Sequence, residues 1–183
     1  MKRVLICTGL LFAATTLFAQ PAPPKKPPLS PPATASASVN GKTITITYSS
    51  PRVRGREGQI FTKDGLISKD PHYPVWRAGA NAATTLETSS DLMIGDLHVP
   101  AGTYTLFVDI SDPAHWVLIV SKATGEWGLA YDPTKDLGKT PMMMSKPATM
   151  VEDLTYSLAV DNGNGTLTLA WEDVSASVNF MVQ

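Results

Sequence analysis

Apolar and polar residues alternate along most of the chain after Ala33, with the two-residue period of a half-buried β-strand. In the first run, Ile44, Ile46 and Tyr48 alternate with threonines. The same alternation recurs in four later runs, at Tyr104–Ile110, Leu154–Val160, Leu167–Trp171 and Val174–Val182. Because each such strand has one apolar face, we expect these segments to pack around a shared core.

Turn signals separate these runs at short intervals. Gly95-Asp96 suits a tight hairpin turn, Pro100–Gly102 reverses the chain again, and Asn162–Gly165 supplies residues that tolerate positive φ. Trp116–Val120 is apolar without alternation, which indicates a strand covered on both faces. No sustained helical period interrupts the strands. The pattern predicts an all-β fold, an antiparallel β-sandwich of jelly-roll-like type, with a flattened β-barrel as the alternative.

The first 34 residues do not share this pattern. Lys2 and Arg3 precede an apolar run, Val4–Phe18, which ends at the small residue Ala19, the order of a secretory signal peptide. We therefore expect a signal peptide at residues 1–19, a Pro-rich spacer of polyproline geometry at 20–34, and a single β domain at 35–183. This organisation predicts a periplasmic or extracellular protein.

Charge and cysteine content narrow the possible partners. The only cysteine, Cys7, lies in the expected signal peptide, so the mature chain has no thiol for disulfides, catalysis or metal binding. Removal of residues 1–19 leaves 13 basic against 16 acidic residues, and the chain has no nucleic-acid-binding motif. We expect no nucleic-acid partner and, after cleavage, no membrane partner. The sequence does not define an oligomeric state.

Two short segments carry the candidate binding residues. Arg52, Arg54 and Arg56 occupy every second position, so an extended chain would point their guanidinium groups the same way, toward a carboxylate or phosphate. The alternative is a solvated strand edge, where charge prevents unwanted pairing.

The second segment joins Trp76 and Arg77 to Asn81 through a glycine. An aromatic face, a guanidinium and an amide are able to bind a sugar or small anion. The alternative is a packing role, with Trp76 as a buried anchor, Arg77 paired with a carboxylate such as Glu87 or Asp91, and Asn81 capping a turn. The predicted ligand-binding residues are therefore Trp76, Arg77, Asn81, Arg52 and Arg56.

Signals for catalysis and metal binding are weak. His72, His98 and His115 show no metal-ligand spacing, and methionines at Met142–Met144 suit a core as well as soft copper. There is no nucleophile elbow or phosphate loop. We expect no metal and no cofactor, and the sequence identifies no catalytic residue.

Several strings together resemble a bacterial family, domain of unknown function 2911 (DUF2911). They are VWRAGANAAT at Val75–Thr84, PAGTYTLF at Pro100–Phe107 and TLTLAWED at Thr166–Asp173, with shorter matches around Tyr48–Pro51 and Arg54–Arg56. The chain departs from the family pattern at Thr62–Tyr73, which is longer and more polar. The resemblance implies export and β architecture, and it implies no activity.

These observations lead to three hypotheses of function. The first is a non-catalytic exported domain whose loops bind a small polar or anionic ligand such as a carbohydrate. The second is an envelope-associated hydrolase in which Asp, Glu and His side chains meet in a cleft. The third is a structural or protein-interaction module with an exposed apolar sheet face.

Overall fold

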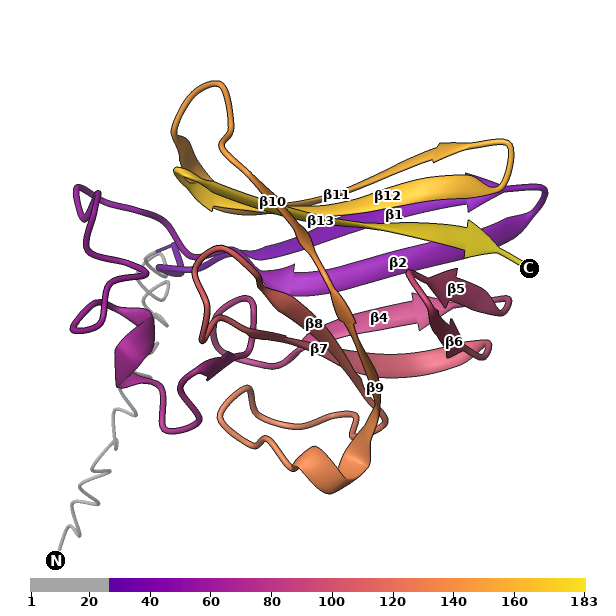
Figure 1. Ribbon diagram of the computed structural model, residues 1–183, viewed down its shortest axis with the longest axis horizontal. Helices are drawn as coiled ribbons and strands as arrows, with labels where there is room; N and C mark the ends of the chain where they lie inside the picture. Colours follow the sequence, from indigo (N-terminus) through magenta and orange to yellow (C-terminus); the bar gives the residue numbers. More distant parts are fainter. Residues whose placement is uncertain (1–26) are drawn as a thin grey trace, which may run out of the picture.

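The computed structural model describes residues 27–183, and the expected signal peptide at 1–19 lies outside the described residues. Two antiparallel sheets stack face to face as a sandwich (Figure 1). This confirms the predicted all-β sandwich, and the described strands do not close into a barrel. Among the described residues, no helix has the length and apolar character needed to cross a bilayer.

The first sheet runs in the order β1-β2-β4-β7-β8-β9, with the short β3 paired to β7. Its strands follow one another in chain order, although β5 and β6 of the second sheet come between β4 and β7 along the chain. Its strands are β1 (Pro32–Val39), β2 (Lys42–Ser49), β3 (Val75–Trp76), β4 (Thr84–Thr88), β7 (Gly102–Asp109), β8 (Val117–Ser121) and β9 (Asp136–Pro141).

The second sheet runs in the order β11-β12-β13-β5-β6, with β10 paired to β13. The sheets lie against each other along both margins, β1 beside β11 and β6 beside β9. The strands are β5 (Leu92–Ile94), β6 (Leu97–Val99), β10 (Met143–Ser145), β11 (Val151–Asp161), β12 (Asn164–Glu172) and β13 (Val174–Val182). Two short 3-10 helices, η1 (Ile67–Lys69) and η2 (Pro133–Lys135), lie in the connections.

The core follows the predicted alternation. Ile44, Ile46 and Tyr48 are buried, whereas the threonines between them are exposed or half-buried. Strand β7 differs, because Thr105 and Phe107 on its outer face are buried as well. The connection that contains η2 covers that face: Thr105 donates a hydrogen bond to the carbonyl of Ala123, and the ring of Phe107 packs 4.9 Å from that of Tyr131, centroid to centroid.

The hairpins form where turn residues predict them. Gly95 links β5 to β6 with φ +55°, and Asn162 and Gly163 link β11 to β12 with φ +48° and +86°. In the Asn162-Gly163 turn, positive φ at both central positions matches the right-handed twist of the paired strands. The turn at Asn40-Gly41, between β1 and β2, has the same geometry, although the alternation of Ala, Ser and Thr in β1 did not predict a strand there.

Strand β1 begins at Pro32, before the expected domain boundary at residue 35. Residues 32–34 pair in register with β2, from Pro32 opposite Ser49 to Thr34 opposite Thr47. Pro31 continues the contact, because its carbonyl accepts a hydrogen bond from the N–H of Ser50 at 2.8 Å. The end of the Pro-rich segment is thus part of the folded domain.

Candidate functional site

The connection between β2 and β4, residues 50–83, lies at one end of the sandwich and carries β3 and η1 (Figure 1). It encloses a cavity of about 410 Å³, which we term the loop-face cavity. This volume is within the range of about 300–1,000 Å³ that is usual for small-molecule sites. The residues that line it are Leu29, Ser30, Pro51, Arg52, Arg54, Arg56, Leu66, Ile67, Lys69, Asp70, Pro71, Trp76, Arg77, Gly79, Ala80, Asn81, Leu129 and Trp171.

Two tryptophans line the cavity from the core side. The indoles of Trp76 and Trp171 stack with centroids 6.0 Å apart and planes 18° apart, and Phe61 meets both edge-on at 5.7 Å. Each indole is only 1% exposed. Trp76 therefore packs as a core anchor, and it offers no free ring face on which a sugar could stack.

The side chain of Arg77 is fixed by a nearly buried carboxylate. Its Nη2 lies 3.0 Å from Oδ2 of Asp70, whose side chain is only 5% exposed. The other oxygen of Asp70 accepts a hydrogen bond from the N–H of His72 at 3.0 Å. The expected pairing of Arg77 with a carboxylate is confirmed, but the two carboxylates given as examples were wrong: Glu87 faces Thr103 on β7, and Asp91 accepts from His98 and Ala101.

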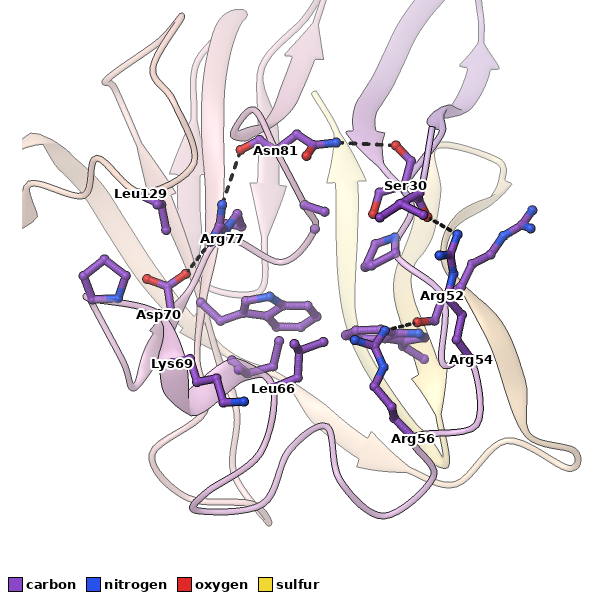
Figure 2. A pocket seen from close by; sticks show the side chains of 18 residues that line it. Ser30, Arg52, Arg54, Arg56, Leu66, Lys69, Asp70, Arg77, Asn81 and Leu129 are labelled. Carbon is purple, nitrogen blue, oxygen red and sulfur yellow. Dashed lines mark hydrogen bonds and ion pairs between the residues drawn. The ribbon is translucent and has the colours of Figure 1, made fainter. Parts of the chain in front are cut away.

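Asn81 connects three segments of the cavity wall. It adopts φ +59°, and its carbonyl accepts hydrogen bonds from Arg77 at 3.4 Å and from the N–H of Gly128 at 3.2 Å. Its side-chain amide donates to the carbonyl of Ser30 at 3.4 Å (Figure 2). The amide therefore holds the end of the Pro-rich segment in place.

The absence of a side chain at Gly79 allows the backbone to pack closely against Thr84, and it is not needed to admit a ligand. A Cβ at this position would lie 2.7 Å from Oγ1 of the buried Thr84, closer than real Cβ contacts come. The Thr84 hydroxyl in turn donates to the carbonyl of Ala78 at 3.1 Å. A side chain at Gly79 would displace this buried contact.

The arginine row does not form an extended strand, contrary to the sequence expectation. Arg54 and Gly55 have φ of +53° and +70°, so the chain turns between Arg52 and Arg56. All three arginines nevertheless line the cavity, on the wall opposite Arg77 and Asp70 (Figure 2). A turn thus places on one cavity wall the three arginines that an extended strand was expected to align.

Backbone carbonyls hold two of these guanidinium groups without neutralising their charge. Arg54 donates to the carbonyl of Leu29 at 2.9 Å, and Arg56 donates to the carbonyls of Val53 and Arg52 at 2.9 and 2.6 Å. Arg52 differs, because its Nε pairs with Asp153 at 2.6 Å.

The cavity carries an excess of positive charge. Five of its lining residues are cationic, and Asp70, the only lining carboxylate among residues 27–183, is already paired with Arg77. Within the same residues, no carboxylate lies within 4 Å of the charged groups of Arg54, Arg56 or Lys69. A local site with three unpaired cations attracts anions even in a mildly acidic protein.

The family model described as "Protein of unknown function (DUF2911)" matches residues 30–180, which include the whole wall of this cavity except Leu29. The chain belongs to the DUF2911 family. Searches of curated proteins and of solved structures found no match to the chain.

In this DUF2911 domain, two glutamates of the second sheet position the turn at residues 52–56, which we term the arginine turn. The carbonyl and a carboxylate oxygen of Glu152 accept hydrogen bonds from the backbone N–H groups of Val53 and Arg54, at 2.9 and 3.0 Å. The carboxylate of Glu172 accepts from the N–H of Gly58. Burial raises the pKa of Glu172, against the opposing effect of that hydrogen bond.

Sequence reasoning did not identify four residues that matter to this site. Lys69 and Asp70 lie in the polar segment Thr62–Tyr73, and Glu152 and Glu172 lie on strands far along the chain. For Lys69 and Asp70, the one available sequence signal was that Thr62–Tyr73 is longer and more polar than the family pattern. No local pattern indicates that the glutamates contact the arginine turn.

The histidines of the DUF2911 domain lie in separate places. His72 contacts the carbonyl of Leu129 at 2.7 Å, His98 pairs with Asp91 at 3.0 Å, and His115 pairs with Asp112 at 2.8 Å. Between residues 27 and 183, no three His, Cys, Asp or Glu side chains gather as metal ligands would. The cavity itself offers cations and backbone groups to a ligand.

Proposed function

We propose that this protein is an exported, non-catalytic binding domain that holds a small anionic ligand, such as an acidic carbohydrate, in the loop-face cavity. The observation that carries the proposal is the gathering of Arg54, Arg56 and Lys69 around a cavity of about 410 Å³ without carboxylate partners. Guanidinium and ammonium groups bind carboxylate, sulfate or phosphate through charge-assisted hydrogen bonds.

The surroundings of these cations favour binding over hydrolysis. A hydrolase that uses paired carboxylates needs two of them at a set separation across the reacting bond. Within residues 27–183 the cavity is lined by a single carboxylate, Asp70, whose two oxygens are engaged by Arg77 and by the N–H of His72. Asp70 thus serves to hold the wall together, and no second lining carboxylate among these residues could act with it across a bound sugar.

The export part of the proposal is supported by the sequence at residues 1–19 and by the absence of cysteine after residue 7. A protein that has left the cytoplasm meets glycans and organic anions of the envelope or surroundings. Fractionation of the producing cells, with the mature N-terminus determined by mass spectrometry, tests this part by itself. An uncleaved protein in the cytoplasmic fraction would refute it.

Isothermal titration against a panel of organic anions and acidic sugars tests the binding. The informative variant is Arg54→Gln with Lys69→Gln, since both side chains are exposed. The control is Lys63→Gln with Lys135→Gln, which removes the same charge from positions outside the cavity wall. A charge-assisted hydrogen bond contributes about 1.5–3 kcal/mol, so we expect the cavity variant to bind at least about tenfold more weakly. Equal loss in both variants, or no binding to any anion, would refute the proposal.

A further inference from the structure

Two exposed aromatic side chains flank the wall formed by Asp70 and Arg77. Trp127 is 58% exposed and Tyr73 is 41% exposed, whereas the other three tryptophans are buried. Exposed aromatic rings on a soluble domain often mark binding sites, because their apolar faces gain from being covered. We term Trp127 and Tyr73 the flanking aromatics.

The segment that carries Trp127 pairs with the cavity wall. Trp127 forms an isolated antiparallel bridge with Ala82, and hydrogen bonds on either side join Gly128 to Asn81 at 3.2 Å and Ala83 to Glu126 at 3.3 Å. Lining residues lie close to this bridge on both segments: Asn81 directly precedes Ala82, and Leu129 stands two positions after Trp127. The backbone at Trp127 is therefore held next to residues that line the cavity.

Gly128 brings this segment close to Arg77. A Cβ on Gly128 would lie 2.6 Å from Cδ of Arg77 and 2.7 Å from the carbonyl oxygen of Asn81. The absence of a side chain at Gly128 is what allows the stem of Arg77 to lie against the backbone beside Trp127. The backbone of the Trp127 segment thus lies directly against the Arg77 side of the cavity.

Tyr73 reaches the same side of the cavity through a different segment. Its N–H donates to the carbonyl of Asp70 at 3.0 Å, which closes a turn directly after the residue that pairs with Arg77. His72 then joins this turn to the Trp127 segment through the carbonyl of Leu129. Both flanking aromatics therefore lie on segments that are hydrogen-bonded to the wall of Asp70 and Arg77, although neither side chain lines the cavity.

We propose that the ligand is an acidic oligosaccharide, with an acidic sugar in the loop-face cavity and the next sugar unit against Trp127. This inference rests on the proposed function and specifies its ligand. The cavity supplies cations for a carboxylate or sulfate, but its own tryptophans expose no ring face. A stacking surface for a sugar ring is available outside the cavity, at Trp127.

The neighbours of the flanking aromatics favour a glycan over a protein partner. Trp127 lies between Glu126 and Gly128, and Tyr73 lies between His72 and Pro74, so each ring has a polar or charged residue beside it along the chain. A sugar presents an apolar C–H face surrounded by hydroxyl groups and suits such a mixed surface. The core of a protein interface is generally more continuous and apolar.

Calorimetry with galacturonic acid, trigalacturonate and the neutral maltotriose tests this inference. We expect the acidic trimer to bind about tenfold more tightly than the monomer, because stacking adds to the anion contact, and maltotriose to bind much more weakly. Trp127→Ala removes the advantage of the trimer and leaves monomer binding unchanged. The control is Met181→Ala, an equally exposed apolar side chain on β13 at the opposite end of the sandwich, and it changes neither.

Fluorescence gives a second readout that does not depend on affinity. Trp127 is the one tryptophan accessible to solvent, since Trp76, Trp116 and Trp171 are all at most 3% exposed. Bound trigalacturonate should therefore protect the emission of Trp127 from acrylamide quenching, whereas the monomer should not. Trp127→Phe is expected to keep most of the trimer affinity, because a phenyl ring also stacks.

The outcomes separate this inference from the proposed function. If monomer and trimer bind equally, or if Trp127→Ala weakens both alike, the inference is wrong while anion binding stands. Binding of maltotriose as tight as that of trigalacturonate would refute the acidic class. If neither uronate binds and a different anion, such as citrate, binds through Arg54 and Lys69, the glycan is excluded. Failure of every anion refutes both proposals.

Discussion

The backbone N–H of Gly58 donates a hydrogen bond to the carboxylate of Glu172, which joins the arginine turn of the first half of the chain to the end of β12. Glu172 has φ +58° and is almost completely buried, an uncommon setting for a glutamate. Together with Glu152, it fixes the loop that carries Arg52, Arg54 and Arg56 onto the opposite sheet. The position of the cations in the cavity thus depends on carboxylates that do not line it.

Glu172 makes stability depend on pH. Burial raises its pKa, so the folded state favours the protonated form more than the unfolded state does, and this contribution to stability is lost as pH rises through the raised pKa. Glu172→Gln keeps an oxygen acceptor for Gly58 without the buried charge. We expect urea unfolding of the variant to show a smaller loss of stability than wild type as the pH rises from about 4, near the ordinary pKa of a glutamate, toward neutrality. A steeper loss in the variant would contradict this account.

Arg77 and Asp70 form a pair that stabilises the wall independently of any ligand. Arg77→Ala leaves the Asp70 carboxylate, 5% exposed, without its cation, and we expect a loss of about 3 kcal/mol in the free energy of unfolding. The double variant Arg77→Ala with Asp70→Ala should lose less than the sum of the two single variants. Additive losses in chemical denaturation would show that the pair is not coupled.

Trp76 is buried and Trp127 is exposed, so we expect substitution of these two tryptophans to affect stability very differently. Removing the buried indole in Trp76→Ala is expected to cost about 3–5 kcal/mol, because it opens a hole in the cluster with Trp171 and Phe61. Trp127→Ala changes an exposed position and should alter stability by less than about 0.5 kcal/mol. Thermal and urea denaturation of both variants measure this contrast, and similar costs would overturn it.

Gly128 sets the distance between the Trp127 segment and Arg77. In Gly128→Ala, either the Arg77 stem or the backbone at Asn81 must shift, since the new methyl group would lie under 3 Å from both. We expect galacturonate, the proposed ligand unit, to bind about tenfold more weakly, because the Arg77 side of the cavity is displaced. Ala82→Ser, an exposed substitution on the paired segment, serves as the control and should leave affinity unchanged.

The β fold could be predicted from sequence because alternation is a local property. Ile44, Ile46 and Tyr48 are buried as their spacing predicts. Strand β1 was missed because its alternating residues are Ala, Ser and Thr, whose contrast in polarity is small. The turn at Arg54-Gly55 was also missed, since alternate arginines fit a strand equally well until the positive φ is seen.

The candidate site could be predicted only in part, because its contacts are long-range. The residues Arg52, Arg56, Trp76, Arg77 and Asn81 were predicted as one ligand-binding set, and the fold brings all five to one cavity. Their partners depend on how connections fold across the sandwich. Asp70 reaches Arg77 only because η1 and the following turn bring residues 67–73 back beside β3.

The hydrogen bonds that the carbonyls of Leu29 and Ser30 accept determine where an expressed chain should begin. An expressed chain that starts at Ala35, where the composition first turns from proline-rich to β-like, would lose the acceptors of Arg54 and Asn81. It would also lose the pairs of Pro32, Ala33 and Thr34 with β2. Such a shortened protein would lack part of the wall of the loop-face cavity, whereas a start at residue 27 or earlier retains the complete wall.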